Sequence, residues 1–125
     1  MFGATEIYNA LNVSSITNLL DAWETEKALF NDSLIPESFT GKESINFYLS
    51  GTVDGGSEIP AYIYSVNCRS ETFKKSVAMA LAVYTALNRA YTNGGFKVCS
   101  ILRTIPPVDP TDVYNTPIEI KIITR

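Results

Sequence analysis

The chain has 125 residues, of which 46% are hydrophobic and 18% charged, and its formal net charge is −3. This length fits a single domain spanning residues 1–125, and the apolar share suits one core and excludes an intrinsically disordered chain. The absence of histidine excludes an imidazole general base, a Ser-His-Asp triad and a histidine metal site. Carboxylate-only or lysine-based catalysis stays open in principle, but no arrangement of such residues argues for it, so we expect no enzymatic activity.

The N-terminal third predicts short helical pieces and an irregular stretch. Residues 5–11 form an apolar pattern typical of a helix, and Ser14–Ser15 offers an N-cap for a second short turn up to residue 20. Residues 21–35 remain ambiguous, because Leu29–Phe30 and Leu34–Ile35 favour a broken edge strand while the residues between them favour a turn.

Two half-buried strands come next. Residues 44–50 alternate with Ile45, Phe47 and Leu49 on one side, and residues 61–69 alternate in the same way. The intervening Asp54–Gly55–Gly56 loop suits a hairpin connection, so these strands should pair antiparallel.

The longest predicted element is a helix over residues 71–92, with Ser70 as its N-cap. Its expected core-facing stripe recurs at three- and four-residue steps and consists of Phe73, Val77, Ala80, Leu81, Tyr84, Leu87 and Tyr91. Asn93–Gly94–Gly95 should end it, because glycine tolerates the left-handed conformation at a helix C-terminus.

Two further strands are predicted at residues 96–103 and 117–125, joined by a long, proline-rich connection over residues 104–116. The fold class expected from this order is α+β. A mostly antiparallel sheet of four to five strands should be covered on one face by the long central helix and a short N-terminal helix.

Charge is unevenly distributed along the chain. Residues 1–60 contain nine Asp or Glu and two Lys or Arg, a net −7, whereas residues 61–125 carry a net +4. Such a domain could dock head-to-tail on copies of itself, unless the two halves interleave in the fold, and the sequence leaves both arrangements open. The lack of a compact basic run argues against specific nucleic-acid binding.

Neither a secretion signal nor a membrane partner is expected, because no basic segment precedes an apolar run at the N-terminus and no apolar run has the length of a membrane span. Cys68 and Cys99 are too few for a zinc site and are expected to be small core residues on strands. No metal or cofactor is expected.

Two segments resemble a known family. One is Ile59–Ser70, which leads directly into the alanine-rich helix, and the other is Val108–Ile120, an acidic and aromatic loop that leads into the last strand. Together they resemble the tail terminator, or tail-to-head joining, proteins of long-tailed bacteriophages, over roughly residues 28–125.

This resemblance implies a structural virion protein without enzymatic activity or cofactor, assembled in the host cytoplasm and located at the head-proximal end of the tail. Members of the family form a ring, expected here to be a hexamer, that caps the tail tube, ends tail elongation and docks to the head connector. The partners implied are further copies of the chain, the tail tube protein and the head connector or a head-completion protein.

The candidate contacts with neighbouring subunits or the tube are regional. Basic candidates for pairing with acidic residues of a neighbour are Arg69, Lys97 and Arg103, and the loop candidates are Asp109, Asp112 and Tyr114. Two rival interpretations remain: another virion joint, such as a head-completion protein or the tube subunit, and a small ligand-binding α+β domain. The missing histidine and the lack of converging polar residues argue against the second.

Overall fold

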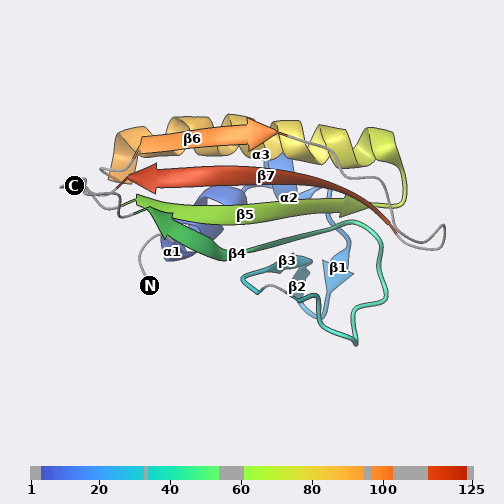
Figure 1. Cartoon of the computed structure of the whole chain (residues 1–125). Helices are drawn as coiled ribbons and strands as arrows, with labels where there is room; N and C mark the ends of the chain where they lie inside the picture. The colour runs from blue at the N-terminus through green and yellow to red at the C-terminus, as the bar shows by residue number, and fades with distance from the viewer. Residues whose placement is uncertain (1–3, 33, 54–60, 95–96, 103–112, 124–125) are drawn as a thin grey trace.

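Figure 1 shows the protein as a computed structural model that describes residues 4–32, 34–53, 61–94, 97–102 and 113–123. In chain order the elements are α1 (Ala4–Leu11), α2 (Ser14–Thr17), β1 (Ala22–Trp23), β2 (Glu26–Lys27), β3 (Leu29–Phe30), β4 (Ser44–Val53), β5 (Ala61–Ser70), α3 (Phe73–Gly94), β6 (Lys97–Leu102) and β7 (Tyr114–Ile123). None of the described helices combines the length and apolar character needed to cross a membrane.

The sheet has five strands in the order β3-β4-β5-β7-β6, and every neighbouring pair is antiparallel except β3 with β4. All three helices lie on one face of this sheet, with α3 running across β5, β7 and β6 (Figure 1). The predicted fold class, a mostly antiparallel sheet covered on one face by a long helix and a short N-terminal helix, is confirmed.

Strand alternation places the core between the sheet and the helices. In β5, Tyr64, Val66 and Cys68 are buried, and Tyr64 faces Leu49 of β4 and Ile120 of β7 across the two ladders. The same face receives Ile7 and Leu11 from α1, which are completely buried. The predicted facing of these strands is therefore confirmed, as is the core location of Cys68.

The buried side of α3 differs from the prediction. The core-facing residues are Ser76, Met79, Ala80, Val83 and Leu87, whereas three members of the predicted stripe, Phe73, Leu81 and Tyr84, are 52%, 52% and 42% exposed. Two apolar stripes run along this helix. The stripe that packs against the sheet is the one that includes Ser76. Ser76 is accepted in the core because its hydroxyl donates to the Cys68 carbonyl oxygen at 2.7 Å and lies 2.7 Å from the Thr116 hydroxyl.

Both predicted helix N-caps are wrong, whereas α3 ends at Gly94, within the predicted Asn93–Gly94–Gly95 segment. The helix α3 begins at Phe73, so Thr72 occupies the cap position, and its Oγ1 accepts the backbone N–H of Lys75 at 3.2 Å. Ser70 is the last residue of β5 instead. At α2, Ser14 is already helical, and Val13 holds the cap position with an extended backbone and no side-chain cap bond.

The ambiguous N-terminal stretch contains a tight hairpin and a short edge strand. The strands β1 and β2 pair antiparallel through a turn in which Glu24 adopts a positive φ of 54°. Leu29–Phe30 alone forms the edge strand, and Leu34–Ile35 is not a strand. Trp23, Phe30 and Phe39 pack edge to face beneath this hairpin, with ring centroids 5.6 to 6.0 Å apart.

The last strand starts earlier than expected. Tyr114 to Thr116, assigned to the connecting loop by the sequence, pair with Ser70 to Cys68 of β5. Pro117 lies inside this strand, beyond the point where β6 ends its pairing opposite Ile118. The missing N–H of Pro117 therefore faces a side of β7 where no described strand requires it.

Candidate interaction surfaces

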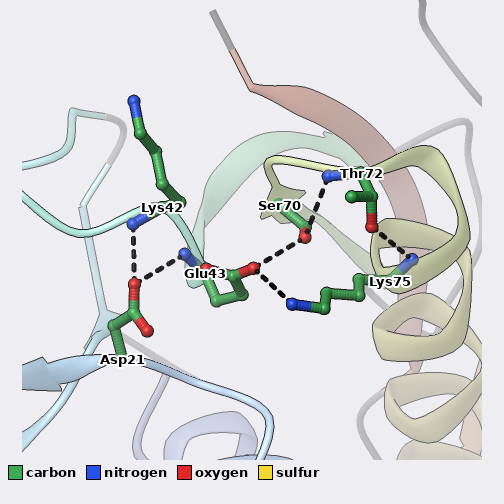
Figure 2. A network of polar contacts seen from close by, with 6 residues as sticks. All are labelled: Asp21, Lys42, Glu43, Ser70, Thr72 and Lys75. Atoms are coloured by element: carbon green, nitrogen blue, oxygen red, sulfur yellow. Dashed lines mark hydrogen bonds and ion pairs between the residues drawn. The ribbon is translucent and has the colours of Figure 1, made fainter.

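A polar network joins the segment before β4 to the beginning of α3 (Figure 2). The Asp21 Oδ2 atom accepts the backbone N–H groups of Lys42 at 2.7 Å and Glu43 at 3.1 Å. The Glu43 Oε1 atom accepts the Ser70 hydroxyl at 3.1 Å and lies 3.5 Å from the Lys75 Nζ atom. These bonds fix the end of the β3–β4 connection against the sheet and the helix.

The Asp21 carboxylate is tuned by this network. Partial burial raises the pKa of Asp21, and the backbone hydrogen bonds from Lys42 and Glu43 lower it. The lowering effects together are the larger, so the pKa of Asp21 lies below its ordinary value. Gly41 is required beside it, because a Cβ atom there would lie 2.6 Å from the Asp21 Oδ2 atom and 2.6 Å from the Phe39 ring. The arrangement is that of a structural clamp, since each carboxylate is occupied by donors of the same chain.

A cationic hollow of about 170 Å³ lies at the end of the sheet where β4 begins and β5 ends. Its lining residues are Ile35, Phe39, Gly41, Lys42, Ser44, Arg69 and Val113. Arg69 is half-buried, and within the described part of the chain its guanidinium has no carboxylate at ion-pair distance. Arg69 and Lys42 both belong to this lining, so the hollow suits a carboxylate from outside.

An exposed apolar surface covers the outer side of the helical layer. It consists of Val13, Leu19, Leu81 and Tyr84, each between 39% and 52% exposed. A hollow of about 560 Å³ follows it between the α1–α2 turn and α3, with Ala82 and Thr85 in its lining. Val13 and Leu81 both line this hollow, and exposed apolar side chains gathered in this way commonly mark contact sites on proteins.

The structure places only part of the predicted contact set. Arg69 lines the cationic hollow, and Tyr114 packs edge to face on the exposed Phe73 ring, with centroids 6.2 Å apart. Lys97 is the first residue of β6, and its side chain is outside the described part. Arg103, Asp109 and Asp112 lie outside the described residues.

Sequence reasoning missed Lys42, which reaches the Arg69 hollow from a connection distant in sequence, and the outer apolar surface of α3. The latter had a signal in the sequence, since the helix carries two apolar stripes and one sheet can bury only one of them. Among the described residues, no group of three Asp, Glu or Cys side chains is placed to hold a metal ion. Burial raises the pKa of the Cys68 thiol, so this cysteine is poorly suited to act as a nucleophile.

The sequence matches no protein-family model and no curated protein. The fold, however, is similar to that of a chain in the virion of a native gene transfer agent particle, with a TM-score of 0.74 and 13% sequence identity. The similarity covers 97% of this chain and 92% of the virion chain. At this identity the comparison establishes a shared fold.

Proposed function

We propose that the protein is a structural subunit of a phage-like virion, and more specifically a tail terminator. In this role copies form a ring, of six subunits by resemblance to the family, that caps the tail tube, ends elongation and offers a docking surface to the head connector. The observation that carries the proposal is the fold shared with a chain of the gene transfer agent virion over nearly the full length of both chains. The two sequence segments that resemble tail terminators support the same role.

The exposed apolar surface of the helical layer supports an assembled state. Leu81 and Tyr84 leave about half of their side chains in water, and an assembly contact would bury them. At the rate of about 25 cal/mol per Å², covering such side chains contributes favourably to association. A subunit that works by assembly needs this kind of surface and does not need a catalytic group, so we propose no enzymatic activity.

The cationic hollow supports a charged contact as well. Arg69 and Lys42 face the same small hollow, and a neighbouring carboxylate would supply the partner that the Arg69 side chain lacks among the described residues. We propose Arg69 as a contact residue on these grounds, and Tyr114 remains a candidate from the sequence. Lys97, Arg103, Asp109 and Asp112 remain candidates from the sequence.

The test is the mass and shape of the protein with and without tail tube protein, by light scattering and negative-stain electron microscopy. Rings in solution, or tubes capped at one end, are the expected result. A chain that remains monomeric and leaves tube length unchanged refutes the terminator role. Binding to the connector without any effect on tubes would indicate a head-completion protein instead.

The acidic loop offers a second, more local test. Asp112→Lys reverses a charge in the segment that resembles the family, and we expect weaker ring or tail assembly with unchanged monomer folding. Tail assembly equal to that of the unaltered protein would remove Asp112 from the contact set.

A further inference from the structure

As far as the described residues show, the five-stranded sheet has an open edge at each side. On the β4 side, β3 pairs only with Ile45 and Asn46, and from Phe47 onward no described segment forms a backbone hydrogen bond with the outer side of β4. On the opposite side, β7 is the only strand of the described residues that pairs with β6. Figure 1 shows these two edges at opposite borders of the sheet. An open edge presents unpaired N–H and C=O groups that can template another strand.

The hydrogen-bond pattern identifies which residues of β4 face outward. The Ile45 N–H donates to the Ala28 carbonyl oxygen at 2.9 Å, so the backbone groups of Ile45 point away from β5. Because this direction alternates from one residue to the next in a strand, Phe47 and Leu49 also present their N–H and C=O groups at the open edge. A register shift between Leu49 and Gly51 then bends the strand, which confines regular pairing to the segment before it.

The same alternation carries across the ladders to β6. Val66 faces Phe47 in the register, so its backbone groups turn to β7, where they meet Ile118. Glu119 therefore turns to β6 and meets Ile101, which leaves Ser100 and Leu102 with outward groups. Pro117 supports this assignment, because the pattern directs its nitrogen to the side where β6 has ended.

We propose that β6 of one copy adds to the open edge of β4 of a second copy, antiparallel, through the outward groups of Phe47 and Leu49 and of Ser100 and Leu102. The strand directions favour this partner, because β4, β5, β7 and β6 alternate, so β4 of a second copy in the same orientation continues the alternation. Such a contact joins different surfaces of each copy and repeats head-to-tail, which generates a ring when the rotation closes. The inference rests on the proposed ring-forming role and specifies how its subunits join.

Charge favours the same pairing over a two-fold contact between two β6 edges. Residues 1–60, with a net charge of −7, supply β3 and β4 to the five-stranded sheet, and residues 61–125, with a net charge of +4, supply β5, β7 and β6. Within the order of the sheet the two halves therefore do not interleave, and Figure 1 shows β4 and β6 at opposite borders with β5 and β7 between them. Pairing β6 with β4 brings opposite net charges together, whereas pairing β6 with β6 brings like charges together.

The experiment blocks one edge at a time. Ser100→Pro and Leu49→Pro each remove one outward N–H, and the controls Ser100→Ala and Leu49→Ala also replace the native side chain while keeping that N–H. Native mass spectrometry should find rings in the two alanine variants and none in either proline variant. Mixing the two proline variants should restore one contact and give a heterodimer that grows no further. Circular dichroism verifies that each variant is folded.

The alternatives give different patterns. A β6–β6 contact would let Leu49→Pro form a homodimer, and the mixture would contain no heterodimer. Rings that persist in both folded proline variants overturn the edge pairing and leave the ring-forming role intact. If the unaltered chain forms no ring, either alone or on tail tubes, both proposals fail together.

Hydrogen exchange provides a measurement that requires no variant. On assembly, the exchange of the Leu49 and Ser100 amides should slow by about ten-fold or more, because each gains a hydrogen bond. The Tyr48 and Ile101 amides point into the existing ladders and should change little. Equal protection of all four amides in monomer and ring overturns the proposed pairing, whatever the fate of the proline variants.

Discussion

Two neighbouring positions of α3 provide a sharp test of how this helix is seated. Val83 is fully buried, whereas Leu81, two residues earlier, is 52% exposed. The sequence pattern alone assigns Leu81 to the core, so the two arrangements predict opposite outcomes. The perturbation is the pair of single substitutions Val83→Ala and Leu81→Ala, which truncate each side chain to the same methyl group.

The magnitudes follow from burial. Val83→Ala removes two buried methyl groups, at about 0.8 kcal/mol each, and leaves a small cavity, so we expect a loss of about 2 kcal/mol in the free energy of unfolding. Leu81→Ala removes side-chain atoms that are half in water and introduces the best helix former, so its loss should stay below about 1 kcal/mol. For a domain of this size, about 3 to 5 °C in Tm corresponds to 1 kcal/mol.

The assay is urea unfolding of the two variants and the unaltered protein, followed by circular dichroism under conditions in which all three are monomeric. Monomeric conditions matter because burial of Leu81 in an assembly would add to its apparent contribution. A Leu81→Ala loss equal to or larger than that of Val83→Ala would mean that the helix presents its other stripe to the sheet. The assignment of the outer apolar surface would then be wrong.

Three further outcomes are expected. Asp21→Asn should lower stability at neutral pH, because the pKa of Asp21 is depressed and its contribution is fully present above the ordinary carboxylate pKa of about 4. The contribution is lost as the pH falls through the lower folded-state pKa, so urea unfolding should show the difference from the unaltered protein shrinking in acid. Gly41→Ala should cost about 1 to 3 kcal/mol in the same assay, because the new methyl group collides with the Asp21 carboxylate and the Phe39 ring; an unchanged midpoint would contradict that close approach. Arg69→Gln should weaken ring or tube-end assembly while Lys27→Gln, an exposed control, does not, and equal assembly of the two variants in light scattering would remove the cationic hollow from the contact surface.

The sequence predicts the sheet well because alternation reports directly on burial. In β4 and β5 every second residue must be apolar to face the helices, and this requirement is local to each strand. The five-stranded order and the parallel edge strand β3 required the structure, since two residues such as Leu29–Phe30 carry no period of their own.

Helix α3 was harder to orient because its two apolar stripes are equivalent by pattern. Which stripe is buried is decided by partners distant in sequence. Ser76 is buried because the Cys68 carbonyl and the Thr116 hydroxyl lie within reach of its hydroxyl. A polar residue that finds its partners only in the folded state is invisible to a hydrophobic pattern. The early start of β7 was hidden for a related reason, because Pro117 is read as a strand breaker until its open side is known.

The sequence predicted a charged contact site that includes Arg69, but it did not predict that Lys42 belongs to the same site. The sequence proposes Arg69 as a candidate for pairing with a neighbour, and the structure places it in the lining of the hollow. Lys42 joins it through the connection that Asp21 and Glu43 hold in place, so the hollow exists only once that clamp is formed. A binding surface whose residues come from several distant segments therefore cannot be predicted from local sequence. A strand can be, because its pattern lies in consecutive residues.

The low sequence identity to the virion chain of the same fold has a physical explanation, because core residues and surface residues are under different constraints. The fold requires that the core-facing positions of the strands and the inner stripe of α3 stay apolar and of suitable volume, and many different side chains meet that requirement. The outer stripe of α3, the cationic hollow and the outward backbone groups of β4 and β6 are not constrained by the core. Two chains with 13% identity can therefore keep one fold while their contact surfaces diverge. Backbone pairing between strand edges is the contact least sensitive to such divergence, because it uses N–H and C=O groups that every residue except proline carries.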